Sequence, residues 1–133
     1  AKGPYVFFSG DDGSFSGSFH FAIFNSQDGK QLFTDAMKND EMYAIQLSAT
    51  NDLSLYYKRI YSLPCSPNVK NSASRRACEA RIKKETALRL LPSCVHKYQE
   101  QDGIHYPVNV LLEKGKPAKM VPAPGKATCI RSM

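Results

Sequence analysis

The sequence of 133 residues lacks the features that mark several large classes of proteins. It has no tryptophan, and its longest apolar runs are far shorter than the roughly 20 residues that span a bilayer as a helix. It contains no glycine-rich phosphate loop, no GxSxG nucleophile turn and no CxxC pair. These absences argue against membrane insertion and against the corresponding nucleotide-binding, hydrolase and zinc-knuckle chemistry. We expect no cofactor.

What is present describes an ordinary globular chain. The hydrophobic fraction of 42% and the charged fraction of 23% do not suggest disorder or a coiled coil. A chain of this length buries about two thirds of the surface that its unfolded form exposes, which is enough for one core. No repeat or long linker divides the sequence, so a single domain over residues 1–133 is expected.

The four cysteines, Cys65, Cys78, Cys94 and Cys129, give the clearest indication of class. Consecutive cysteines are 13, 16 and 35 positions apart, which is too far for a zinc knuckle. An even number of cysteines without metal-binding spacing predicts two disulfides. Because disulfides persist in oxidising compartments, we expect a secreted, extracellular protein. The alternative is a cytosolic protein with four reduced thiols.

Helix geometry narrows the disulfide pairing. If residues 74–91 form one helix, Cys78 and Cys94 lie about 24 Å apart, whereas a disulfide needs α-carbons within about 7 Å. This removes Cys78–Cys94 and, with it, Cys65–Cys129. We favour Cys65–Cys78 with Cys94–Cys129, which staples the start of the helix and ties down the C-terminal tail. The pairing Cys65–Cys94 with Cys78–Cys129 stays open.

The first 63 residues show the alternating apolar pattern of β-strands. The pattern predicts strands over 14–24, 31–34, 41–49 and 53–63, and Asp28-Gly29 is a strong signal for a hairpin turn. The residues predicted to share an apolar face within each strand are Phe15, Phe19, Phe21 and Ile23; Tyr43, Ile45 and Leu47; and Leu53, Leu55, Tyr57, Tyr61 and Leu63.

The composition changes at about residue 72. Residues 72–91, SASRRACEARIKKETALRLL, are rich in residues that favour helices. Ser72 or Ser74 is expected to cap the start of this helix, and Pro92 to end it. A helical wheel predicts an apolar face of Ala73, Ala77, Ala80, Ala87, Leu88 and Leu91.

The chain then returns to strand patterns. Residues 103–115 alternate again, with Ile104, Tyr106, Val108, Val110 and Leu112 on the apolar side. The tail over 115–133 contains three prolines, a short strand expected around ATCIR, and Cys129 to hold it. This order predicts an α+β fold, with a mostly antiparallel sheet and one basic helix over about 72–91 packed on it. A small β-sandwich or barrel with one inserted helix is the alternative.

Positive charge gathers in the predicted helix. Residues 70–89 hold seven basic and two acidic side chains, a net +5 of the +6 carried by the whole chain. Such a cluster is the expected footprint of a surface that meets an acidic protein or phosphates, although helices also carry charge simply to face water. Few aromatic residues lie among these charges, and stacking on single-stranded nucleic acid needs them. A protein partner is therefore favoured over nucleic acid, and the candidate binding residues are Arg75, Arg76, Lys83 and Lys84.

Two loops and one strand face supply further binding candidates. SGDDGS at 9–14 contains Asp11 and Asp12, and NSQDGK at 25–30 contains Asp28; exposed turns of this kind are common contact elements. Neither loop has the spacing of a calcium site, so no metal is expected. In YYKRIY at 56–61, Tyr56 lies on the face opposite Tyr57, beside Lys58, which is typical of protein-recognition surfaces.

A catalytic interpretation rests on scattered residues. His20 and His105 are predicted on sheet surfaces, with Glu41 and Arg59 on nearby strands. Two proton-transfer groups and an arginine that holds phosphate would suffice for a metal-independent ribonuclease. No motif surrounds these residues.

The sequence therefore predicts a small, secreted, disulfide-bonded, basic α+β protein that acts by binding. The leading hypothesis is an effector or inhibitor that acts on a host protein such as a protease. The alternative hypothesis is an extracellular ribonuclease, or a catalytically inactive relative that binds RNA.

Overall fold

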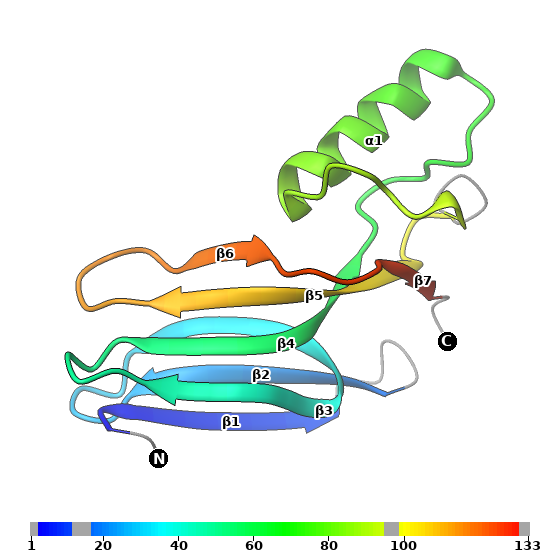
Figure 1. Ribbon diagram of the computed structural model, residues 1–133. Coiled ribbons are helices and arrows are strands. Elements are labelled where there is room, and N and C mark those ends of the chain that lie inside the picture. Colours follow the sequence, from blue (N-terminus) through cyan, green and yellow to red (C-terminus); the bar gives the residue numbers. More distant parts are fainter. Residues whose placement is uncertain (1–2, 12–16, 95–98, 131–133) are drawn as a thin grey trace.

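The computed structural model describes residues 3–11, 17–94 and 99–130, and it describes the side chains of all of these except Asp11, Asp40 and Glu41. It contains a seven-stranded sheet and one helix, and the sheet is not closed into a barrel (Figure 1). The predicted α+β class is confirmed. The elements are β1 (Tyr5–Asp11), β2 (Ser18–Asn25), β3 (Gln31–Leu47), β4 (Leu53–Ser62), α1 (Ser72–Thr86), β5 (Gly103–Leu112), β6 (Lys119–Pro122) and β7 (Thr128–Ile130).

The strands follow one another as an antiparallel meander. Their order in the sheet is β1-β2-β3-β4-β5-β6. β6 pairs with the second half of β5, and β7 pairs with the first three residues of β5. The hairpin turn predicted at Asp28-Gly29 is confirmed: Gly29 has a φ of 73°, and the Lys30 amide donates to Asp28 Oδ1 at 2.9 Å. Neighbouring strands are thus neighbours in sequence, which makes short turns sufficient for most of the sheet.

The strand β3 joins two strands that the sequence pattern separated. Residues 31–34 and 41–49 were predicted individually, but 31–47 form one strand that pairs with β2 and with β4. Its pairing with β4 shifts register twice between Met37 and Ala44, and Asn39 has a φ of 61°. Such bulges bend a strand and re-aim its side chains, and periodicity does not register them.

The core lies on one side of this bent sheet. The apolar faces predicted for the strands at 53–63 and 103–115 are confirmed, because their residues are at most 7% exposed. Rings from different strands meet there: Phe21 on β2 lies 5.0 Å from Tyr57 on β4 and 5.4 Å from Phe7 on β1. The most buried members are Phe21, Ile23, Met37, Leu53, Leu55, Tyr57, Leu63, Ile82, Ile104, Tyr106, Val108 and Val110.

The helix is shorter than predicted. It begins after Asn71, whose side chain accepts a hydrogen bond from the Ser74 amide at 3.0 Å, so the expected serine caps are wrong. It ends at Thr86 because Ala87 takes a left-handed conformation, with φ 60°, and donates its amide to the Lys83 carbonyl. The predicted helix, which was expected to run to residue 91, is therefore five residues too long at this end.

The helix also buries a different face from the one predicted. Cys78, Ile82 and Thr86 are buried, whereas the alanines of the predicted face are exposed. In Figure 1, α1 stands beyond one end of the sheet, near the end of β4 and the start of β5, rather than lying across a sheet face. Tyr61 at the end of β4 donates to Glu85 Oε1 at 2.7 Å, which joins helix and sheet. The disulfide at Cys78 selects this face.

Both disulfides have the favoured pairing. Cys65 and Cys78 are joined across a Cα–Cα distance of 5.8 Å, and Cys94 and Cys129 across 6.1 Å. The first attaches α1 to the segment that leaves β4. The second holds the C-terminal tail, which contains β6 as well as the expected short strand around 127–131.

Candidate functional site

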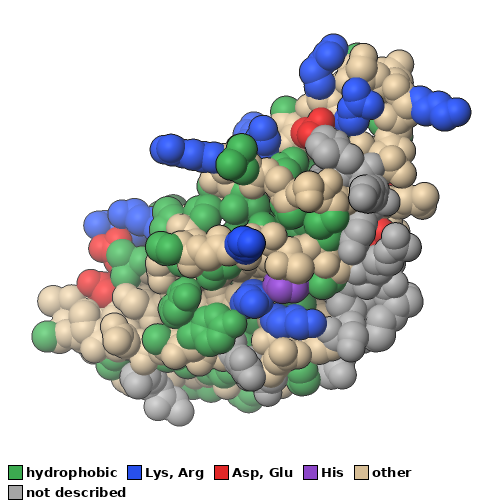
Figure 2. All heavy atoms as spheres, turned by 45° about the vertical axis from the view of Figure 1, so that its right-hand side comes forward, with side chains coloured by type: hydrophobic (Ala, Val, Ile, Leu, Met, Phe, Trp, Pro, Cys, Tyr) green, Lys and Arg blue, Asp and Glu red, His purple; other side chains and the backbone are tan. Residues whose placement is uncertain are grey.

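The charged side chains of the helix face solvent, as the sequence suggested. Arg76, Lys83 and Lys84 are exposed, and Arg75 is half-buried, with its Nη1 3.5 Å from the Val69 carbonyl. Lys83 and Lys84 lie in the last turn, where positive charge complements the helix dipole. Figure 1 shows α1 standing out from the sheet, and Figure 2 shows Lys and Arg side chains projecting at that end of the molecule.

The loop candidates have unequal structural support. Asp28 is exposed at the tip of the β2–β3 hairpin, a turn that is also held by the Asn25 amide donating to the Lys30 carbonyl at 2.8 Å. Asp12 and the side chains of Asp11 and Glu41 lie outside the described part of the protein. The hairpin at 25–30 is therefore the one predicted contact loop whose geometry is known.

The outer face of β4 carries the aromatic candidate. Tyr56 points away from the core while Tyr57 is fully buried, as predicted. Tyr43 joins Tyr56, with ring centroids 5.1 Å apart. The prediction that Tyr43 shares a face with Ile45 and Leu47 is wrong: Tyr43 is 47% exposed, because the register shift between Met42 and Ala44 turns it outward.

Lysines and a proline-rich loop surround the two tyrosines. A depression of ≈ 420 Å³ is bordered by Tyr43, Tyr56, Lys58 and Lys126, together with Pro107, Pro124 and Gly125. We call this set the aromatic–basic patch. Figure 2 shows hydrophobic side chains beside Lys or Arg side chains and a histidine over the sheet, below the charges of the helix.

Gly125 fixes one wall of the aromatic–basic patch. Its φ of 139° is one that L side chains rarely adopt, and a Cβ there would lie 2.8 Å from Pro107 Cγ. The Ala123 amide donates to the Pro107 carbonyl at 2.9 Å and holds the same loop on β5. The glycine thus lets the loop approach the sheet closely enough to place Lys126 beside the tyrosines.

His105 lies on the same outer face. It pairs with Ile60 of β4, two positions from Lys58. Its Nδ1 is buried without a hydrogen-bond partner among the described groups. Burial, then Lys58 and Lys38, lower the pKa of His105 to about 4, so the ring is neutral at neutral pH. The positive charge of this face therefore comes from its lysines.

The four residues of the catalytic interpretation are not gathered into one site among the described side chains. His20 on β2 and His105 on β5 face the same side of the sheet, but β3 and β4 lie between them, a separation of about 14 Å along the sheet. His20 is instead 2.7 Å from the Thr34 hydroxyl. Arg59 points to the opposite side, toward the core, where it meets Asp35 and Tyr106. Two groups that act on one phosphate need to lie much closer than these histidines do.

Arg59 belongs to a buried polar network. Its Nε donates to Asp35 at 3.1 Å, and its Nη1 donates to the Tyr106 hydroxyl at 2.8 Å. Tyr57 donates to the same carboxylate at 2.5 Å. Burial, and then Asp35, raise the pKa of Tyr57. Burial lowers the pKa of Arg59, but Asp35 and Tyr106 together outweigh burial and the net shift is upward. The network keeps Tyr57 neutral and Arg59 charged, which suits a structural role inside the core.

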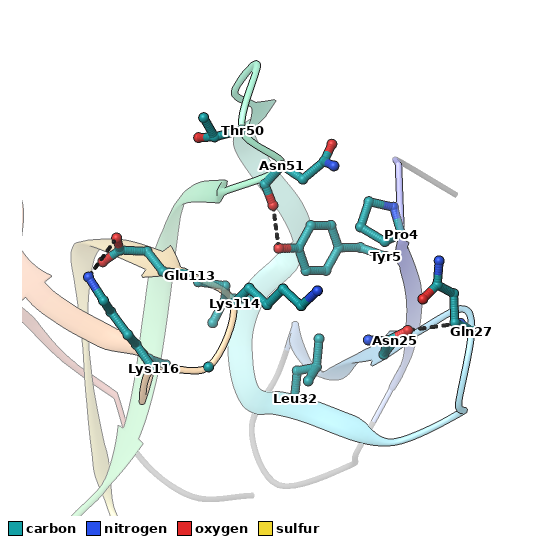
Figure 3. A pocket seen from close by; sticks show the side chains of 13 residues that line it. Pro4, Tyr5, Asn25, Gln27, Leu32, Thr50, Asn51, Glu113, Lys114 and Lys116 are labelled. Carbon is teal, nitrogen blue, oxygen red and sulfur yellow. Dashed lines mark hydrogen bonds and ion pairs between the residues drawn. The ribbon is translucent and has the colours of Figure 1, made fainter.

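A larger cavity opens where the strands turn. It has a volume of ≈ 570 Å³ and is bordered by the start of β1, the β2–β3 hairpin and the β5–β6 turn (Figure 3). Tyr5 spans one wall and donates to the Asn51 carbonyl at 2.6 Å. Lys114 extends along the cavity, whereas Lys116 pairs with Glu113. The cavity brings the predicted contact hairpin, through Asn25 and Gln27, next to the β5–β6 turn.

Several residues of these surfaces were not predicted. Tyr43 was assigned to the wrong face, and Lys126 was not singled out because its contacts are made only in the folded protein. The Pro/Gly-rich stretch PAPGK at 122–126 predicts a rigid turn, but it does not indicate which residues that turn packs against. Asp35 offered a clearer signal, since it interrupts the apolar row of Phe33 and Met37 on β3.

The fold and its surfaces define a disulfide-bonded α+β protein with an open antiparallel sheet and a basic, aromatic outer face. Within the described residues no group of three or more His, Cys, Asp or Glu side chains is placed to hold a metal ion. The helix that the structure describes is not long and apolar enough to cross a membrane. Comparison with known proteins finds no matching family model, no matching curated protein and no matching solved structure.

Proposed function

We propose that this protein is a small secreted binding protein that acts on a protein target, as an effector or inhibitor. The observation that carries the proposal is the Tyr43–Tyr56 pair on the outer face, which borders a surface depression together with Lys58 and Lys126. Tyrosines offer large contact area at a low cost in side-chain entropy and are enriched at the centres of interfaces. The two disulfides support an extracellular location, where such a protein meets its target.

The charges indicate the kind of partner. Lysines around an aromatic centre favour an acidic protein surface, and the exposed cations of α1 add to the same field. In this arrangement the patch supplies contact energy and the helix supplies electrostatic steering. A protease whose cleft has an acidic rim is one target of this chemistry.

The proposal is tested by affinity capture with matched variants. Immobilised wild-type protein is compared with Tyr43→Ala/Tyr56→Ala and with Leu90→Ala, because Leu90 is 83% exposed and does not border the patch. We expect a partner that is retained by the wild type and by Leu90→Ala and is lost with the tyrosine variant. A partner retained equally by all three proteins, or by none, would refute the assignment of the patch.

Kinetics then separate the patch from the helix. Arg75→Glu/Arg76→Glu should slow association with the captured partner while changing the dissociation rate little. An unchanged association rate would mean that the helix only faces solvent. If the partner is a protease, substrate cleavage measured with increasing amounts of this protein reports inhibition directly.

RNA binding is the second candidate, and a separate observation favours it. Lys58 and Lys38 lie near enough to His105 to lower its pKa, so cations gather beside rings on which bases stack. The aromatic neighbours that the basic helix lacks are thus present on the sheet. Mixed RNA on a gel at two salt concentrations tests this: salt-sensitive retardation that Tyr56→Ala weakens supports it, and unretarded RNA removes it.

A further inference from the structure

The first strand leaves one edge of the sheet open. β1 is the outermost strand and, among the described elements, it pairs only with β2. The Ser26 amide donates to the Pro4 carbonyl at 2.8 Å, which shows that the backbone groups of residue 4 point toward β2. Backbone direction alternates along a strand, so those of Tyr5, Phe7 and Ser9 point to the open edge.

In the described part of β1, residues 5–10 of this edge lack charged side chains, proline and a bulge. Natural sheets protect an exposed edge with charged side chains, proline or a bulge. Residues 5–10, YVFFSG, contain no charged residue and no proline. The pairing of β1 with β2 runs from Tyr5 to Asp11 without a register shift. A strand of this kind favours pairing with another strand.

The outer face beside this edge is apolar and uncharged. Phe8 is 61% exposed and packs edge-on against Phe24, with ring centroids 5.7 Å apart. Together with Ala22 and His20 they border a shallow depression of ≈ 450 Å³. Residues 3–10 and 18–27 contain no Asp, Glu, Lys or Arg, although the chain carries a net +6. Here two copies of this cationic chain can approach with the least repulsion.

From the free backbone groups and the neutral apolar face together, we propose that two copies of this chain pair antiparallel through β1 and form a dimer with one continuous sheet. A two-fold axis beside Phe7 pairs Phe7 with its own copy and Tyr5 with Ser9 of the other copy. This register uses the outward backbone groups for about six hydrogen bonds. On the outer face it places Val6 against Phe8 of the other copy, which covers the exposed ring.

Two variants with the same chemical change test the dimer. Phe8→Lys puts a charge at the centre of the proposed contact, and Val121→Lys puts one on β6 at the far edge, where Val121 is 55% exposed. Sedimentation equilibrium should give twice the chain mass for the wild type and for Val121→Lys, and Phe8→Lys should weaken dimerisation by at least about tenfold. Circular dichroism checks that both variants keep the fold.

Salt and hydrogen exchange add independent readouts. Added salt should strengthen the dimer, because it screens repulsion between two cationic chains. The amides of Phe7 and Ser9 should exchange more slowly as protein concentration rises, in the wild type but not in Phe8→Lys. A wild type that stays monomeric up to about 0.5 mM overturns the proposal. A dimer that Phe8→Lys leaves intact, or that Val121→Lys breaks, also overturns it.

Discussion

Replacing Asp35 by alanine should destabilise this protein more than almost any other single change at a polar residue. The Asp35 carboxylate accepts hydrogen bonds from Tyr57 at 2.5 Å and from Arg59 at 3.1 Å. The side chains of Asp35 and Arg59 are only 10% and 18% exposed. Asp35→Ala therefore leaves a guanidinium with little access to water and without its counter-charge, and it leaves a buried phenol without its acceptor.

The magnitude follows from these contacts. Removing one partner of a buried ion pair costs about 3–5 kcal/mol, because the remaining charge stays desolvated. The hydrogen bond that Tyr57 loses belongs to the same network, so its energy is not added in full to the cost of the broken ion pair. We expect the free energy of unfolding of Asp35→Ala to fall by about 3–5 kcal/mol, and the melting temperature by about 10–20 °C. Urea unfolding followed by circular dichroism measures this change.

Two companion variants give the prediction its control. Arg81→Ala removes an exposed ion pair with Glu85. Because the Arg81 and Glu85 side chains are 57% and 40% exposed, this variant should lose far less stability than Asp35→Ala. Asp35→Leu/Arg59→Met removes both buried charges and should recover at least about 2 kcal/mol relative to Asp35→Ala. The reasoning is refuted if Asp35→Ala costs no more than Arg81→Ala, or if the double variant is no more stable than Asp35→Ala.

Three further predictions concern other parts of the molecule. The pKa of His105 is lowered to about 4 in the folded protein, against about 6.5 in the unfolded chain, so its contribution to stability is present above pH 6.5 and is lost as the pH falls toward 4. From pH 7 to pH 5, His105→Gln should therefore lose about 1 kcal/mol less stability than the wild type, a value already reduced for the partial exposure of the ring. Equal losses of the two proteins in urea titrations would contradict this. Gly125→Ala should cost about 1–3 kcal/mol because its φ is 139° and Pro107 blocks the new methyl group; a melting temperature equal to that of the wild type would argue against this strain. Cys94→Ser/Cys129→Ser opens a loop with a sequence separation of 35 and should lower the free energy of unfolding by about 4 kcal/mol. Opening the Cys65–Cys78 disulfide, with a separation of 13, should lower it by about 3 kcal/mol. The reverse order in urea unfolding would contradict the loop-entropy reasoning.

The parts of the fold that were predicted correctly depend on local patterns. The period-2 alternation of β4 and β5 identified which side of each strand is buried, because a strand residue faces the core or solvent according to its position in the pleat. Asp28-Gly29 specified its own turn through the positive φ that glycine tolerates. The favoured disulfide pairing is also correct, but the helix assumed over 74–91 to narrow it ends at Thr86, so the helical distance between Cys78 and Cys94 is not the reason for it.

The errors occurred where a distant contact overrides the local pattern. The wheel of α1 favoured its alanines, but the helix turns Cys78 inward because Cys65 holds it there, and Ile82 and Thr86 follow one and two turns later. Tyr43 faces outward because β3 has to match two partners and bulges between them. Neither constraint is visible in a window of neighbouring residues.

The candidate binding residues divide in the same way. Tyr56 and the exposed cations of α1 were identified from sequence, because strand alternation and charge clustering are properties of adjacent residues. Tyr43 and Lys126, which border the same depression as Tyr56, come from β3 and the tail. Strand pairing brings Tyr43 there, and the close approach of the tail loop to β5 brings Lys126.

By itself, the sequence determined the class of this protein, which is an α+β chain with two disulfides and a basic helix. It also indicated the buried sides of β4 and β5, through their alternation of apolar and polar residues. The tertiary structure decided which surfaces are available. It gathered tyrosines and lysines from three segments into one patch, turned Arg59 inward to Asp35, and left β1 at an open edge. The physical reason is that secondary structure follows from short-range sterics and burial, whereas a surface depends on which distant segments pair and on where their registers shift.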